Sequence, residues 1–556
     1  MFVDCMSMTP DAGVVLANDI PGVPGALLIE NLVPQAGPGR CVVHKGPVAA
    51  TITGTAGDQM FVARQMALAP QLIYSAGPSY VSAWNQTAVS YTRLTGALGY
   101  ASAPAWQIIE FGNNMIALPN DPSYAIQPQI RVNHTGACAN LFTSTATPLA
   151  RAAGVVRNHL FLGNCLYGGT TFAQRVWWSA RDNARDFDPS ISTRCGFVDL
   201  VDDYGSIRAI MGGSNAIVFK SQGIHRFDFV GGETVWEQQQ LSTGVGTLSP
   251  HSVVELAGDL YFRARDGFYV LKGRQGAPIP IGEGTVWNTP IRHGPNGVYG
   301  AWTDVDAGTP GLSSSRFGSK WQAYVMEGCG VVVFRYSGGT EAGEVHLCYH
   351  PSSDRWAVVR YGDGAGANYT PRWYFNNTYG DSSSTGISAD ADLLASTTPG
   401  KDVAALDYTT APRIVEASSS AGSQDVPDLN GNAAMVISKL VQVPAPMRLT
   451  AVRVRAGCAW PSAHESLFAL GTVSVRYNDQ AWANADDDPD GLGYTAALAV
   501  DADGWHSFDP VTAAFVQLKW QNSSSSAARL SQLHAFYGFE LRWEGQFDSG
   551  RDARGS

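Results

Sequence analysis

The amino-acid sequence predicts an all-β protein with a β-propeller-like domain followed by an antiparallel β-sandwich. Charged residues make up only 15% of the 556 residues, and 60 residues are glycine. Typical globular chains have about 25% charged residues and about 7% glycine. Short apolar runs alternate with turn-forming residues along most of the chain, as in proteins built of many short strands. No long helical pattern interrupts these runs,.

Residues 1–45 are expected to form an extended N-terminal arm, because prolines and glycines recur throughout it and proline disrupts a regular helix. Residues 46–380 contain the apolar runs, for example QLIY at 71–74 and FYVL at 268–271. Roughly 350 residues of this rhythm favour a propeller, since radially arranged four-stranded blades leave only short, protected edges. The repeat carries no WD or kelch signature, so the sequence does not give the number of blades.

Two further segments are polar. Residues 381–432 are rich in serine and aspartate and poor in aromatic residues, so we expect surface loops or a linker there. Residues 546–556 have the composition of a flexible, solvated tail,.

Residues 433–545 show alternating apolar and polar positions. Val452 and Val454 fall on one face of a strand, and Arg453 and Arg455 fall on the other. Period-two alternation of this kind is typical of a sheet with one buried face. It predicts a platform-like antiparallel β-sandwich over this range.

Charge and cysteine usage limit the classes of function. The net charge is −11 and basic residues are scattered, whereas a nucleic-acid-binding surface shows clustered Lys and Arg. No run of 18 or more apolar residues is present, so no membrane span is expected, and the first residues lack the pattern of a signal peptide,. The eight cysteines form no CxxC pair; we expect free thiols and synthesis in the cytoplasm.

One acidic run is a candidate metal site. Asp486, Asp488 and Asp490 precede a glycine, and the pattern resembles the first half of a calcium-binding loop. Pro489 interrupts it, and Ala497 stands where such a loop has a bidentate glutamate. An acidic loop between strands is therefore favoured, with calcium binding as the alternative.

Two other patterns have a structural and a metal-binding interpretation. His346, Cys348 and His350 would face the same side of a strand, as metal ligands or as packed side chains. The acidic runs at 304–308 and 501–504 are weaker, and turn formation explains them,.

No residue pattern requires catalysis, so we expect no enzyme, no catalytic residue and no cofactor. Asp186, Asp188, Asp202 and Asp203 could supply carboxylates for glycoside hydrolysis,, but acidic residues near Pro or Gly are common in turns. No G-x-S-x-G motif with matching His and Asp is evident,.

Tryptophans inside apolar strands favour core packing over carbohydrate stacking. They are Trp84, Trp106, Trp177, Trp178, Trp236, Trp287 and Trp302.

Four phrases follow one another in an order that carries a family likeness. They are ALLIENLVPQAGPGR (26–40), VWWSARDNARDFDPS (176–190), IRAIMGGSNAIVFKSQGIHRFDFVGG (207–232) and the stretch over 223–284. In these phrases and their order the chain resembles the tail nozzle proteins of short-tailed bacteriophages, also called tail tubular proteins, including the packaged-DNA stabilisation type. The likeness extends over roughly residues 26–360, with a looser match in the C-terminal sandwich.

The resemblance implies a virion structural protein: a homohexameric tube that continues the portal-adaptor channel, retains the packaged genome and passes it at ejection. It implies as partners other copies of the chain, adaptor and portal ring proteins, tail fibre or spike proteins, and double-stranded DNA in transient, non-specific passage. Six copies would carry a formal charge of 6 × −11 = −66, which disfavours adhesion of DNA. The alternatives are a receptor-binding or glycan-binding phage tail protein, and a propeller hydrolase that uses carboxylates from 186–203.

Overall fold

The computed structural model describes residues 48–282 and 321–361 with short gaps. Outside these ranges it describes the strands whose bounds follow and a few residues beside them. The described chain consists of β-strands joined by turns, with short 3-10 helices η1 (Val132–His134), η2 (Pro250–Ser252) and η3 (Lys272–Arg274). This confirms the all-β prediction.

The described chain contains seven sets of four antiparallel strands, which we call blades one to seven; six are separate sheets, and the set β29 to β32 is the end of a ten-stranded sheet. Blade one contains β7 (Val62–Gln65), β8 (Leu72–Ala76), β9 (Val81–Asn85) and β10 (Ser90–Arg93). Blade two contains β11 (Ala105–Phe111), β12 (Asn114–Asn120), β13 (Gln129–Arg131) and β14 (Ala139–Asn140). Blade three contains β15 (Leu149–Val156), β16 (His159–Tyr167), β17 (Thr170–Trp178) and β18 (Gly196–Asp199). Blade four contains β19 (Ile207–Met211), β20 (Ala216–Lys220), β21 (Gly223–Phe229) and β22 (Trp236–Thr243).

Blade five contains β23 (Val253–Leu256), β24 (Asp259–Arg263), β25 (Phe268–Leu271) and β26 (Ile279–Ile281). A hairpin of β27 (Pro290–His293) and β28 (Val298–Ala301) follows it. Blade six contains β29 (Trp321–Met326), β30 (Val331–Tyr336), β31 (Glu344–His350) and β32 (Arg355–Tyr361). Blade seven contains β33 (Pro371–Asn377), β34 (Asp402–Tyr408), β35 (Pro412–Glu416) and β6 (Val48–Thr53).

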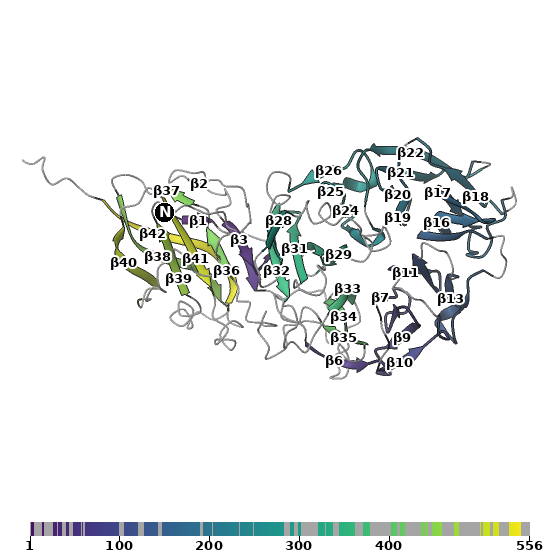
Figure 1. Ribbon diagram of the computed structural model, residues 1–556, viewed down its shortest axis with the longest axis horizontal. Helices are drawn as coiled ribbons and strands as arrows, with labels where there is room; N and C mark the ends of the chain where they lie inside the picture. The colour runs from purple at the N-terminus through teal and green to yellow at the C-terminus, as the bar shows by residue number, and fades with distance from the viewer. Residues whose placement is uncertain are drawn as a thin grey trace, which may run out of the picture.

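The blades form a closed ring (Figure 1). The first strand of each blade is innermost: β7 contacts β11, β11 contacts β15, and β15 contacts β19. η2, which precedes β23, contacts both β19 and β29. β23 then contacts β29, β29 contacts β33, and β33 contacts β7, which completes the ring. The ring is closed by β6, which comes from the N-terminal part of the chain and pairs antiparallel with β35.

The propeller-like domain therefore begins at β6 and ends at β35, later in the chain than residue 380. The expected linker over 381–432 contains β34 and β35, and to that extent the expectation is wrong. These strands have short apolar runs, such as VAAL at 403–406. Serine-rich stretches lie on either side, so the average composition of the segment is polar and the strands do not stand out.

The β-sandwich consists of two sheets. One contains β1 (Phe2–Asp4), β4 (Leu32–Gln35), β5 (Arg40–Val43), β38 (Met447–Cys458), β40 (Trp505–Val511) and β42 (Leu533–Gly545). The other contains β2 (Val14–Val15), β3 (Ala26–Glu30), β36 (Met435–Ser438), β37 (Leu440–Gln442), β39 (Thr472–Tyr477) and β41 (Phe515–Gln521). The N-terminal arm is thus not free, because β1 to β5 are paired within these sheets.

A continuous sheet joins the two domains. β3 pairs antiparallel with β36 of the sandwich and parallel with β32, the outer strand of blade six. The second sandwich sheet and blade six consequently form one ten-stranded sheet. At this point the domains are connected by backbone pairing of Glu30 with Val358,.

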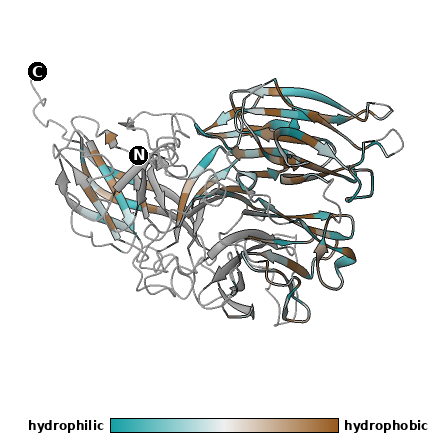
Figure 2. Cartoon of the chain, turned by 45° about the vertical axis from the view of Figure 1, so that its right-hand side comes forward, coloured by the Kyte–Doolittle hydropathy of each residue, from teal (hydrophilic) through white to brown (hydrophobic). Residues whose placement is uncertain are grey.

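The core follows the alternation read from the sequence. Val452 and Val454 are buried while Arg453 is half-buried, and Val516 and Leu518 are fully buried. In the propeller, four buried apolar clusters lie between successive blades from one to five. Figure 2 shows hydrophobic residues along its strands and hydrophilic ones in many of its loops. The blades are therefore stabilised mainly by apolar burial against their neighbours.

Blades three and four approach each other closely at one glycine. A Cβ atom placed on Gly212 would lie 2.0 Å from the carbonyl oxygen of Val155. The next amide, Gly213 N–H, donates a hydrogen bond of 3.1 Å to that same oxygen. Only glycine lets the two backbones come this near.

Candidate functional site: the central cavity of the propeller

A cavity of about 870 Å³ lies at the centre of the ring and is lined by the inner strands of six blades, β7, β11, β15, β19, β23 and β29. Most of its wall is apolar side chain and strand backbone. Its polar lining includes Arg64, Gln107, Glu110, His251, Glu255 and Gln322.

Glu110 holds the first two blades together at the cavity wall. Its carboxylate accepts hydrogen bonds from the backbone N–H groups of Ala67 (2.8 Å) and Leu68 (2.9 Å), just after β7. In return, Arg64 on β7 donates from Nη1 to the carbonyl of Ile108 on β11 at 2.9 Å. Charge-assisted bonds of this kind are stronger than neutral ones, so both charged groups serve to position the inner strands.

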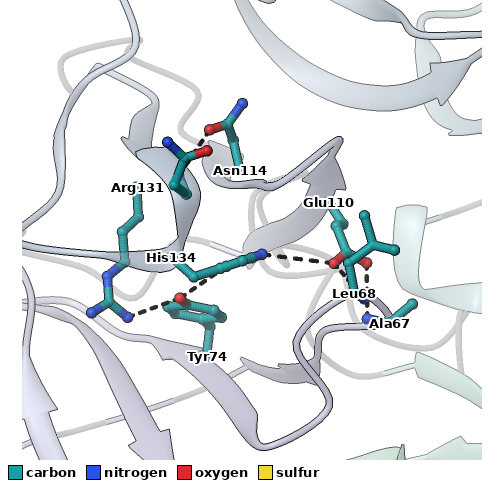
Figure 3. A network of polar contacts seen from close by, with 8 residues as sticks. Ala67, Leu68, Tyr74, Glu110, Asn114, Arg131 and His134 are labelled. Carbon is teal, nitrogen blue, oxygen red and sulfur yellow. Dashed lines mark hydrogen bonds and ion pairs between the residues drawn. The ribbon is translucent and has the colours of Figure 1, made fainter.

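A polar network extends outward from Glu110 (Figure 3). Arg131 donates from Nη1 to the hydroxyl oxygen of Tyr74 at 2.8 Å, and that oxygen lies 3.1 Å from His134 Nδ1. The Tyr74 hydroxyl therefore accepts from Arg131 and shares a second hydrogen bond with the His134 ring,. His134 Nε2 is 3.9 Å from a Glu110 oxygen, beyond hydrogen-bond distance.

The electrostatics of this network favour neutral histidine. Burial lowers the pKa of His134, and the Glu110 carboxylate only partly opposes this.

The turn that carries His134 has an unusual backbone conformation. His134 has a positive φ of 55°, next to Asn133 with φ of 50°, a conformation that is uncommon in residues other than glycine. The Asn133 N–H donates to Asn114 Oδ1 at 3.1 Å, which secures the turn.

The second carboxylate of the cavity joins blades four and five. Glu255 Oε2 accepts from Arg274 Nη2 at 2.6 Å. Arg274 also donates from Nη1 to the carbonyl of Asn215 in blade four at 3.2 Å. Glu110 is thus bonded directly across two blades, and Glu255 is linked to the neighbouring blade through Arg274. These two carboxylates support a structural role for this part of the cavity wall.

No protein-family model matches the chain, and no curated protein sequence matches it. Solved structures with similarity include the crystal structure of RRP9 WD40 repeats, with a TM-score of 0.38 and 8% identity, covering 67% of this chain and 99% of that one. Another is the Neurospora crassa Pan2 WD40 domain, with a TM-score of 0.34 and 7% identity, covering 67% of this chain and 89% of that one. Similarity at this level says nothing of function.

The candidate calcium ligands Asp486, Asp488 and Asp490 lie outside the described residues. Within the described residues, no group of three or more His, Cys, Asp or Glu side chains is arranged to hold a metal ion. The same part of the chain has no helix with the length and apolar character needed to cross a membrane.

The alternating residues of β31 are packed side chains. His346, Cys348 and His350 are all buried. His346 Nδ1 lies 2.9 Å from the Tyr324 hydroxyl, and His350 Nδ1 lies 2.6 Å from Ser353 Oγ. These hydrogen bonds satisfy the two histidines within the blade, in agreement with the packing interpretation.

The acidic turn residues behave as turn residues where they are described. The Asp188 N–H donates to Asp186 Oδ1 at 3.2 Å, and the Trp505 N–H donates to Asp501 Oδ1 at 2.8 Å. Asp202 is exposed. Asp203 and the run at 304–308 lie outside the described residues.

The described tryptophans of this set are either buried or half-buried. Trp84, Trp106, Trp177 and Trp236 are buried, as core packing predicts, while Trp287 and Trp302 lie outside the described residues. Trp178 is half-buried and lines a separate groove between blades three and four.

Among the described residues, the cysteines are not in disulfide bonds, as predicted. They are Cys138, Cys165, Cys195 and Cys348.

Proposed function

We propose that the chain is a tail nozzle subunit of a short-tailed bacteriophage. In this proposal six copies form a tube below the portal and adaptor rings, which retains the packaged genome and passes it at ejection. The protein would act as a structural component of the virion tail and not as an enzyme.

The observation that carries the proposal is the ordered set of four phrases together with where they fall in the fold. The phrase at 26–40 covers β3 and β4 and reaches the first residue of β5, at the joint between the domains. The phrase at 176–190 covers the end of β17 and the turn after it, and the other two cover blades four and five. A propeller-like domain joined to a sandwich is the architecture that the resemblance implies.

The joint between the domains suits a subunit that must transmit force. A subunit of a conduit under internal pressure must transmit force between its domains without separating. In this chain the ten-stranded sheet crosses from blade six into the sandwich, and backbone pairing of Glu30 in β3 with Val358 in β32 makes the crossing,. The engaged carboxylates of the central cavity also fit a structural protein.

The alternative proposal is a receptor-binding or glycan-binding tail protein. The two functions differ in what a particle lacking the chain does. A nozzle subunit is needed to keep DNA inside the head, whereas an adhesin is needed only for attachment to the host.

The experiment is to produce particles of the encoding phage with this gene product absent and to measure nuclease-sensitive DNA. The nozzle proposal expects heads that fill and then lose their DNA, with retention restored when the chain is supplied in trans. Full, stable particles that fail only to adsorb would refute the nozzle and favour the adhesin. Particles of normal infectivity would refute both.

A further inference from the structure

A groove of about 500 Å³ lies between the outer parts of blades three and four. One wall comes from β17, β18 and the segment between them, and the other from β21, β22 and the turn that joins them. Figure 1 places β17, β18 and β22 on the side of the ring away from the sandwich. The groove is therefore separate from both the central cavity and the domain joint.

The ring of Trp178 forms a fixed part of this wall. Its indole N–H donates to the carbonyl of Arg194 at 2.9 Å. A Cβ atom placed on Gly196 would lie 2.7 Å from Trp178 Cζ2, so the ring lies directly against this glycine. The ring is thereby preorganised, which reduces the entropy lost when a ligand stacks on it.

The segment beside Trp178 is held in a strained conformation. Arg194 has a positive φ of 58°, which is uncommon for a residue with a long side chain. Neighbouring Cys195 fixes it, since Sγ lies 3.1 Å from Thr193 Oγ1 and 3.3 Å from the carbonyl of Asp186. Strain that the surroundings maintain is concentrated at functional sites.

The opposite wall is aromatic and contains an unused donor. Trp236 lines the groove and is only 6% exposed, yet its indole N–H has no hydrogen-bond acceptor among the described residues. Buried donors are normally satisfied. At the edge of the groove, the ring of Phe197 is 42% exposed.

The charge of the groove points to the kind of ligand. Arg194 is exposed, and it is the one charged residue among the described residues that line the groove. It is a cation in a chain whose net charge is −11. Thr234 and Gln238 add further hydrogen-bonding groups. A ligand that fits must combine an apolar face, hydrogen-bonding groups and an anion.

We propose that this groove binds an acidic saccharide, with a sugar ring stacked on Trp178 and the sugar carboxylate on Arg194. A sugar ring has a C–H face for the aromatic wall and a hydroxyl edge for Thr234 and Gln238. A lipid chain would leave the polar groups unused, and an inorganic anion would leave the aromatic walls unused. A few placed polar groups in an apolar concavity are the usual form of a small-ligand site.

Calorimetry on the full chain tests this with uronic-acid hexasaccharides of hyaluronan, alginate and polygalacturonate, and with neutral cellohexaose and chitohexaose. We expect binding of at least one acidic probe, and at least tenfold weaker binding of both neutral ones. Trp178→Ala and Arg194→Gln should each weaken that binding about tenfold or more, which corresponds to about 1.4 kcal/mol. Arg181→Gln is the matched control, because Arg181 is exposed in the same blade and does not line the groove.

A second variant, Thr234→Trp, fills the groove from an exposed position, so it should abolish binding without disturbing the core. The proposal is overturned if none of the three acidic probes binds at millimolar concentration. It is also overturned if neutral probes bind equally well, or if Arg194→Gln binds like the unaltered protein. Trp178→Phe should retain most of the binding, which separates stacking from a general loss of structure.

Discussion

The substitution Gly212→Ala should separate blades three and four and destabilise the propeller. The added Cβ would lie 2.0 Å from the Val155 carbonyl oxygen and 2.8 Å from its carbonyl carbon. Contacts of this type below 3.0 Å essentially do not occur, so one backbone must move by about 1 Å at a place where both are held in sheets.

The magnitude follows from two contributions. Overpacking of a close-packed interface costs about 1–3 kcal/mol. The movement also breaks the hydrogen bond from Gly213 N–H to the Val155 oxygen, and such a bond contributes about 1 kcal/mol. We therefore expect a loss of about 3 kcal/mol of unfolding free energy.

Guanidinium unfolding followed by tryptophan fluorescence measures this loss as a lower transition midpoint. Gly96→Ala is the matched control, because nothing lies within 4 Å of its added Cβ. It should be neutral, or more stable by about 0.4–1 kcal/mol through the unfolded state. If Gly212→Ala and Gly96→Ala unfold at the same midpoint, the close packing of these blades is wrong.

Three further outcomes are expected. Burial keeps His134 neutral and lowers the pKa of His251 to about 4. Stability should therefore be greatest above pH 6.5 and fall as the pH drops toward 4, by ~3 kcal/mol for His251 alone; unfolding curves that coincide at pH 7 and pH 5 would contradict this. Trp84→Ala should cost about 3–5 kcal/mol in denaturant unfolding, because Trp84 is fully buried and its indole donates to Ser75 Oγ at 2.7 Å; a loss below 1 kcal/mol would refute that packing. Ile52→Pro removes a backbone donor from β6 where it pairs with Ile414 of β35, and should open the ring without removing β1 to β5, seen as a larger hydrodynamic radius and faster proteolysis, whereas an unchanged radius would argue against this closure.

Features that depend on residues close together in the sequence, such as strand faces and turns, could be predicted from local patterns. Alternation along β38 placed Val452 and Val454 in the core, because a strand turns successive side chains to opposite faces. The short apolar runs likewise predicted four-stranded blades, and the turn at Asp501 followed from its own residue types.

Long-range pairings could not be predicted in this way. β6 and β35 pair although the whole ring lies between them in sequence, and no local pattern encodes that contact. The same holds for β3, whose two partners lie in different domains. The number of blades and the position of the N-terminal arm depended on these pairings.

The polar sites were missed for a similar reason. Glu110 lies within an apolar run, WQIIEF at 106–111, and its role appears only when the turn after β7 approaches β11. Trp177 and Trp178 are adjacent in sequence, yet one is buried and the other faces a groove. The proline-rich arm and the serine-rich 381–432 segment suggested unpaired chain, because composition does not reveal hydrogen bonds supplied from elsewhere.

The most direct test of the proposed tail function is electron microscopy of particles of the encoding phage, labelled with gold-conjugated antibody against this chain. The nozzle proposal predicts label at a single vertex, at the outer end of the portal and adaptor rings. Label along fibres or over the whole capsid, with the epitope shown to be accessible, would contradict it.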